Sequence, residues 1–205
     1  MSFEIHSIPV ASYAGVTIQN SFITQGSKRL IVFLPGLGYT VHHPLFRSLR
    51  NIIMDNGDDL LLVQYGFQVA QSEYSLMNQA DITAECRQAI ELALEKGYQE
   101  IIFIGKSLGT PLAAIFANEF EQTCKAILLT PIQNSHTIIE KTSALAIIGT
   151  ADSHYDETVC VDSALVSWRV YDDLNHSLEI PDKMIASIKV LRQIMGDCTH
   201  FLYSS

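Results

Sequence analysis

Five short runs of almost entirely apolar residues recur along this chain, and longer amphipathic segments separate most of them. The runs span residues 30–34, 60–65, 101–104, 126–130 and 145–148. A strand with one wet face alternates apolar and polar residues, whereas a parallel strand covered on both faces is apolar throughout. The runs therefore predict buried parallel strands, and a further strand is expected at 167–171.

The segments between the runs have the spacing of amphipathic helices. Helices are expected at 44–55, 81–96, 110–120, 156–165 and 181–195. Gly57 and Gly97 stand where two of them should end. Strands that alternate with helices predict a doubly wound α/β fold, with a mostly parallel sheet and helices on both faces.

The amino-terminal segments 3–8 and 16–22 alternate instead, which predicts an antiparallel hairpin at the start of the sheet. The chain has 205 residues, of which 48% are hydrophobic and 17% charged. That length can bury one large core but not two. A single domain over residues 1–205 is expected.

Charge and cysteine content limit the partners and the compartment. A formal net charge of −9 disfavours nucleic acid and anionic membranes as partners, because both favour clustered Lys and Arg. Cys86, Cys124, Cys160 and Cys198 form no CxxC pair and are expected to stay reduced. Residues 1–9 lack the features of a secretory signal, and no apolar run is long enough to span a membrane. We expect a cytoplasmic protein.

Residues 105–109 read Gly-Lys-Ser-Leu-Gly, directly after one apolar run and directly before a helical segment. A GxSxG pattern between strand and helix is typical of a serine held on a tight turn as an exposed nucleophile. Side chains at positions 105 and 109 would collide as the chain reverses. The simpler interpretation is a turn whose Ser107 caps the helix that follows.

In a doubly wound sheet, ligands bind at the carboxyl ends of the strands. Asp152 comes just past the run 145–148, and His176 follows the expected strand at 167–171. These residues are candidates for an acid and a base that would act with Ser107. Among the other histidines, His6 lies in the expected first hairpin, His200 lies near the terminus, and His136 and His154 follow the runs 126–130 and 145–148.

Some of these assignments have alternatives. Asp156 competes with Asp152 for the role of the acid, and Asp152 could be a simple turn residue or helix cap. Adjacent His42 and His43 would point apart, and no third ligand stands at a recognisable spacing, so no metal site is expected. Lys106 is either a partly buried cation paired with a carboxylate or a solvated side chain.

The elbow at 105–109, the order Ser107, Asp152, His176 and the loop Pro-Gly-Leu-Gly-Tyr at 35–39 resemble the α/β-hydrolase superfamily over nearly the whole chain. The chain is most similar to small members without a cap domain. Residues 132–141 are the short segment in which larger relatives insert a lid.

The resemblance implies a serine hydrolase that forms an acyl-enzyme on Ser107, with His176 as the base and Asp152 orienting it. It assigns the oxyanion hole to the backbone N–H groups of Leu37 and Leu108, with Gly38 as the alternative to Leu37. Many relatives carry a histidine where this chain has Pro35, so the support of that loop must differ. No cofactor and no metal are required.

The expected partner is a small-molecule ester or thioester. Two other functions stay open: a non-catalytic relative that binds a small ligand or a partner, and an acyltransferase. Tyr39, Phe67 and Tyr155 are candidates for lining a substrate pocket. Neither the substrate nor the oligomeric state follows from the sequence, because this fold hosts many activities.

Overall fold

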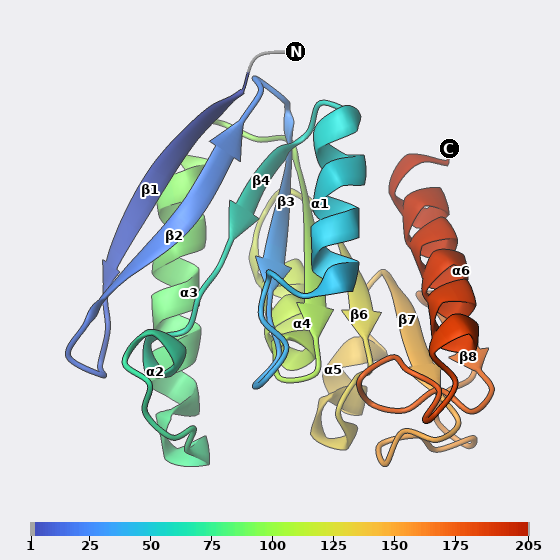
Figure 1. Ribbon diagram of the computed structural model, residues 1–205. Coiled ribbons are helices and arrows are strands. Elements are labelled where there is room, and N and C mark those ends of the chain that lie inside the picture. Colours follow the sequence, from blue (N-terminus) through green and yellow to red (C-terminus); the bar gives the residue numbers. More distant parts are fainter. Residues whose placement is uncertain (1–2, 205) are drawn as a thin grey trace.

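An eight-stranded sheet in the order β1-β2-β4-β3-β5-β6-β7-β8 forms the centre of the computed structural model, which describes residues 3–204 (Figure 1). The strands are β1 (Glu4–Ala11), β2 (Thr17–Thr24), β3 (Arg29–Leu34), β4 (Asp59–Leu62), β5 (Glu100–Lys106), β6 (Thr123–Leu129), β7 (Ala144–Gly149) and β8 (Val166–Tyr171). The β1–β2 and β2–β4 pairs are antiparallel, and all other pairs are parallel. The predicted fold class is confirmed.

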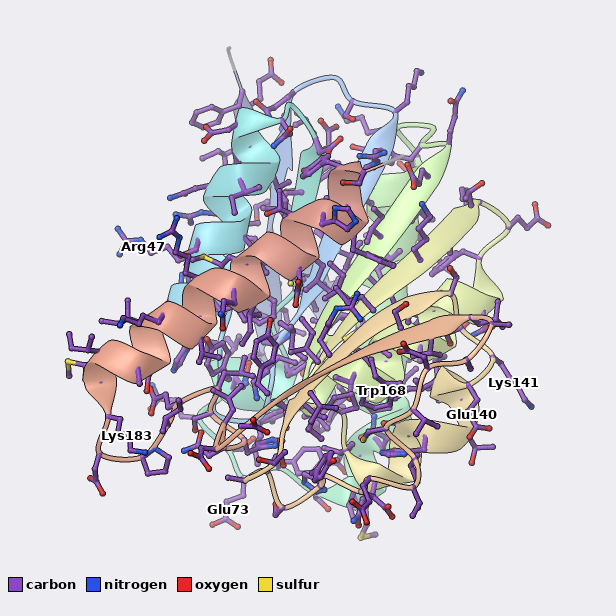
Figure 2. The ribbon with its side chains drawn as sticks, turned by 90° about the vertical axis from the view of Figure 1, so that its right-hand side faces the viewer. Arg47, Glu73, Glu140, Lys141, Trp168 and Lys183 are labelled. Carbon is purple, nitrogen blue, oxygen red and sulfur yellow. The ribbon has the colours of Figure 1, made fainter. Side chains whose placement is uncertain are left out.

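Helices cover both faces of this sheet. They are α1 (Pro44–Asp55), α2 (Gly66–Val69), η1 (Leu76–Asn78), α3 (Gln79–Leu94), α4 (Gly109–Glu119), η2 (Gln133–Ser135), α5 (His136–Ile139) and α6 (Met184–Tyr203). Helices α1 and α6 lie on one face, and α3 and α4 lie on the other (Figure 1). Figure 2 shows α6 crossing obliquely over its face, with Lys183 at its start.

Each apolar run is buried from both sides, as parallel strands require. In β3, Ile31 and Phe33 pack into the core under α1 and α6, whereas Leu30 and Val32 pack into the core under α3 and α4. All four side chains are 0% exposed. Because both faces are covered by helices, no position of the run can be polar without a buried partner.

Most of the helix predictions are confirmed. Helix α1 has the predicted bounds, and α3 and α4 begin within two residues of theirs. Helix α6 begins at Met184 and continues through 20 residues, well past the predicted end. Among residues 3–204, no helix is both long enough and apolar enough to cross a bilayer.

The predicted helix at 156–165 is wrong, because this segment forms turns. Short polar side chains hold its backbone in other conformations. Asp156 Oδ1 accepts the Thr158 N–H at 2.9 Å, and Asp162 Oδ1 accepts the Trp168 N–H at 2.6 Å. Such local side-chain bonds compete with helical ones and outweigh an amphipathic pattern.

Candidate active site

Ser107 occupies a strained turn between β5 and α4. Its φ of 50° is positive, which is uncommon for a residue other than glycine. The Ser107 N–H donates to the Leu129 carbonyl at 2.9 Å, and the Ser107 carbonyl accepts from the N–H and hydroxyl of Thr110 at 2.9 and 2.7 Å. These bonds hold the strained backbone, and strain of this kind clusters at functional sites.

The two glycines of the elbow sit where no side chain fits. A Cβ at Gly105 would lie 2.4 Å from the Gly109 carbonyl oxygen, and a Cβ at Gly109 would lie 2.1 Å from the Leu34 carbonyl oxygen. Both neighbours are backbone atoms, which cannot move aside as a flexible side chain could. The close approach of strand, turn and helix therefore requires glycine at both positions.

The Gly109→Ala variant is expected to lose about 3 kcal/mol or more of unfolding free energy, because its Cβ collides with the backbone of β3. The matched control is Gly196→Ala in α6, where an added Cβ meets nothing within 4 Å. Alanine there should stabilise the helix by about 1 kcal/mol. Urea unfolding of both variants checks this, and equal midpoints for the two would contradict the packing described for the elbow.

Three side chains from different parts of the chain form one hydrogen-bonded row. His176 Nε2 lies 2.8 Å from Ser107 Oγ, and His176 Nδ1 lies 2.8 Å from Asp152 Oδ2. Asp152 Oδ1 also accepts the His154 N–H at 2.9 Å. The structure thus brings together the three residues that the sequence singled out.

Two loops at the carboxyl edge of the sheet carry the acid and the imidazole. Asp152 follows β7, and His176 follows β8. The Ala151 N–H donates to the Leu174 carbonyl at 3.1 Å, and the Asp173 N–H donates to Thr150 Oγ1 at 3.0 Å. Because Leu174 is also fully buried, the two loops are fixed against each other.

The environment of Asp152 favours its charged form. Burial alone would raise the pKa of this carboxyl, but the hydrogen bonds from the His176 ring and the His154 N–H outweigh burial and lower the pKa below its usual value. An ionised carboxylate at Nδ1 favours the tautomer that carries its proton there. Nε2 is then left to accept the proton of the Ser107 hydroxyl.

Asp156, the alternative acid, lies elsewhere. Its Oδ1 accepts hydrogen bonds from the Thr158 N–H and hydroxyl at 2.9 and 2.6 Å. These bonds lower the pKa of the Asp156 carboxyl. The carboxylate at His176 Nδ1 is that of Asp152.

The loop at 35–39 is supported by residues that the sequence did not single out. The Tyr65 hydroxyl donates to the Pro35 carbonyl at 2.7 Å. Gln68 Nε2 donates to the Gly36 and Leu37 carbonyls at 2.9 and 3.0 Å. These three bonds support the loop beside Ser107. The sequence pointed to this support only indirectly, because Pro35 stands where the resemblance alone would place a histidine to hold the loop.

Some backbone N–H groups near Ser107 have no backbone carbonyl partner among the described residues. Within residues 3–204, neither the Leu37 N–H nor the Leu108 N–H bonds to a backbone carbonyl. Leu108 directly precedes α4, where the helix dipole adds positive potential. The Gly38 N–H is equally without a backbone carbonyl partner among these residues, so Gly38 remains the alternative to Leu37.

Lys106 is buried, and its partners are not a carboxylate. Nζ donates to Thr130 Oγ1 at 2.6 Å and to the His176 carbonyl at 2.7 Å, and it lies 5.2 Å from the centre of the Tyr39 ring. Burial lowers the pKa of this ammonium to about 8, although the charge of Asp152 opposes the change. One side chain thus connects the elbow, the end of β6, the loop of His176 and the loop at 35–39.

The Lys106→Met variant is expected to lower kcat for a reaction at Ser107 about tenfold to a hundredfold with little change in KM, because the His176 backbone loses its donor and the imidazole shifts. The exposed Lys141, labelled in Figure 2, offers a matched control for the lost charge. Lys141→Met should keep the wild-type kcat, and equal values for the two variants would contradict this positioning role.

The Lys106→Met variant also tests the burial of the ammonium, through the pH dependence of stability. Because burial lowers the Lys106 pKa from 10.5 to about 8, the unfolded chain binds more protons than the folded one between these values. The unfolding free energy of the wild type should therefore rise by about 3 kcal/mol relative to Lys106→Met over this range. Urea unfolding at several pH values measures the difference, and parallel pH curves would contradict a buried ammonium.

A cavity of about 950 Å³ opens onto Ser107 and His176 and continues toward α6. Of the three aromatic candidates, Tyr39 lines this cavity. Phe67 is buried in the core under α3 and α4, and Tyr155 packs against that core. The cavity is large enough for a small organic substrate.

One group of potential metal ligands occurs among residues 3–204. Asp152, His154 and His176 each offer a ligand atom, and these atoms lie within 4.8 Å of one another. The His154 and His176 ring centres are 5.2 Å apart. Two of the three side chains already bond to each other through His176 Nδ1. His42 and His43 do not belong to this group.

The sequence matches no model of a known protein family, and no curated protein matches it. Its structure is similar to several solved structures. An esterase from Pyrococcus furiosus aligns with a TM-score of 0.71 at 12% identity, over 99% of this chain and 92% of that one. A serine hydrolase without a lid from Xanthomonas campestris aligns with a TM-score of 0.65 at 14% identity, over 93% and 94% of the two chains.

A dienelactone hydrolase from Anabaena variabilis aligns with a TM-score of 0.68 at 16% identity, over 99% of both chains. Identities this low establish the architecture alone. In this chain the connection from β6 to β7 is short and contains only the small helices η2 and α5. The chain therefore has the α/β-hydrolase fold, in its small form without a lid.

Proposed function

We propose that this protein is a serine hydrolase that cleaves a small ester or thioester through an acyl-enzyme on Ser107. The observation that carries the proposal is the row from Ser107 Oγ through His176 to Asp152, with both hydrogen bonds at 2.8 Å. A serine hydroxyl is a weak nucleophile at neutral pH, and an adjacent imidazole held by a carboxylate is the arrangement that activates it.

In the first half-reaction, Ser107 Oγ attacks the substrate carbonyl carbon while its proton passes to His176 Nε2. The charged imidazole is stabilised by Asp152, which stays ionised. His176 then gives this proton to the leaving alcohol or thiol as the carbon–oxygen or carbon–sulfur bond breaks. In the second half-reaction, water attacks the acyl-enzyme, loses its proton to His176 and releases the acid, and Ser107 regains its proton.

Negative charge develops on the substrate carbonyl oxygen in both half-reactions. The N–H groups of Leu108 and Leu37 are the donors we assign to this oxygen, with Gly38 as the alternative in the loop. A donor of this kind contributes on the order of a hundredfold to a thousandfold in rate. The bonds from Tyr65 and Gln68 to the loop carbonyls keep the loop donors oriented before substrate arrives.

The test is labelling with a fluorophosphonate probe, which reacts with activated serine hydroxyls. We expect one label per folded chain, on the peptide that contains Ser107, and none on Ser107→Ala under the same conditions. Intact mass and peptide mass spectrometry provide the readout. A folded wild-type protein that stays unlabelled would favour a non-catalytic, ligand-binding role for the same pocket.

A further inference from the structure

The cavity at Ser107 extends into an apolar channel along the first two turns of α6. We call this the α6 groove and define it by Tyr39, Ile180, Met184, Ile188 and Leu191, all of which line the cavity. It runs between the α1 end of the oxyanion loop and the start of α6, where Figure 2 labels Lys183.

The groove presents large apolar side chains to solvent. Met184 is 77% exposed, Ile188 is 57% exposed, and Leu37 at the oxyanion loop is 51% exposed. Single exposed apolar residues are ordinary, but a cluster around a cavity marks a binding surface. Here the cluster is continuous with Ser107 and His176, so a molecule that fills the groove can also place a bond beside the nucleophile.

The charges of the groove disfavour an anionic occupant. Glu179 and Asp182 stand at its rim, and Lys183 lies 4.0 Å from Asp173. The ammonium of Lys106 already donates to Thr130 and His176. No arginine lines the cavity among residues 3–204, so the bidentate clamp that recognises a carboxylate or phosphate is missing from its described lining.

The wall of the groove is rigidly joined to the loop of His176. Ser187 Oγ accepts the Ile180 N–H at 2.9 Å and lies 3.1 Å from the Lys183 carbonyl. Leu178, between His176 and this segment, is 2% exposed and packs into the core. The groove is therefore preformed, and little ordering is needed when a ligand enters.

Size sets the length of the occupant. From Met184 to Leu191 the helix rises about 10 Å, at about 1.5 Å per residue. An extended hydrocarbon advances slightly less per carbon than a helix rises per residue, so a chain of about eight carbons covers most of that distance. We propose that the α6 groove binds an unbranched, uncharged apolar arm of about eight carbons on the ester or thioester that Ser107 attacks, an inference that rests on the proposed function.

The arm can belong to the acyl or to the alcohol side of the bond, and substrate series separate the two. One series holds the leaving group as p-nitrophenol and varies the acyl chain from acetyl to dodecanoyl. The other holds the acyl group as acetyl and varies the alkyl alcohol from ethyl to dodecyl. An open groove removes about half of the surface of each methylene from water, which is worth about 0.4 kcal/mol. In the series whose chain enters the groove, kcat/KM should therefore rise about twofold per methylene, up to about eight carbons.

Substitutions on α6 provide matched variants. Ile188 lines the groove, whereas Ile185, three residues earlier on the same helix, is 67% exposed and does not line it. Ile188→Trp fills the groove and should therefore disfavour long substrates. In the series that uses the groove, the ratio of kcat/KM for the eight-carbon substrate to kcat/KM for the shortest substrate should fall about tenfold or more. Ile185→Trp adds the same ring outside the groove and should leave this ratio and the basal activity at wild-type values.

A binding measurement does not depend on turnover. Isothermal titration calorimetry measures the affinity of octyl acetate for three proteins. They are Ser107→Ala, the Ser107→Ala/Ile188→Trp double variant and the Ser107→Ala/Ile185→Trp double variant. We expect Ile188→Trp to weaken binding about tenfold and Ile185→Trp to leave it unchanged.

Flat rates along both series, or equal effects of the two tryptophans on rate and binding, would overturn the groove while leaving the serine hydrolase intact. If octyl acetate binds to Ser107→Ala through the groove but the wild type hydrolyses no ester, the proposed function would be overturned instead.

Discussion

Ser107→Ala is expected to hydrolyse p-nitrophenyl acetate about 10⁵-fold more slowly in kcat than the wild type. Removal of Oγ removes the atom to which the acyl group is transferred, and no other hydroxyl on the row can replace it. The activity that remains comes from binding and the backbone donors alone. Steady-state kinetics against a buffer blank measures the loss. Equal rates for the two proteins would mean that the hydrolysis does not pass through Ser107.

Ser107→Gly is the matched companion of this variant. Glycine also lacks the hydroxyl, but it adopts the φ of 50° without the cost that a side chain carries. We expect Ser107→Gly to be as inactive as Ser107→Ala and about 1 kcal/mol more stable than the wild type. Urea unfolding gives the second value. Lower stability than that of the wild type would argue against strain at the elbow.

Asp152→Asn is expected to lower kcat about 10⁴-fold while the fold is kept. The amide is nearly isosteric with the carboxylate, but it can donate an N–H to His176 Nδ1 and so favour the tautomer with its proton on Nε2. That imidazole cannot accept the Ser107 proton. The control is Asp156→Asn, because the Asp156 carboxylate bonds to Thr158. The control should keep wild-type kcat, and a larger loss there than at Asp152 would reverse the assignment of the acid.

Asp152 also has a signature in stability. Because the net effect of its surroundings lowers the pKa of this carboxyl in the folded state, the ionised group stabilises the fold above the ordinary value of 3.8. This contribution is lost as the pH falls through the lowered value of the folded state. Acid unfolding of the wild type should therefore be steeper below pH 3.8 than that of Asp152→Asn.

The fold could be predicted because burial on both faces leaves a clear mark on sequence. The run 101–104 becomes part of β5, and the predicted helix at 44–55 has the bounds of α1. The failure at 156–165 has a local cause, since Asp156 and Asp162 bond to nearby backbone N–H groups. Periodicity does not register such bonds.

The positions of the acid and the base could be predicted, because both residues follow strands at the carboxyl edge of the sheet. Asp152 and His176 follow neighbouring parallel strands, β7 and β8, so their loops had to start close together. The partners of Lys106 and the support from Gln68 were not predictable. Both depend on side chains that meet across segments distant in sequence, and no spacing or motif encodes those distances.

The most direct test of covalent catalysis is to trap the intermediate. Wild-type protein turning over a p-nitrophenyl ester is quenched with acid, digested and examined by mass spectrometry, with Ser107→Ala as the control. The peptide containing Ser107 should carry the acyl group in the wild type, and the control should neither carry it nor turn over the ester. Turnover at the wild-type rate in the control, with no acyl group on Ser107 in either protein, would contradict covalent catalysis by Ser107.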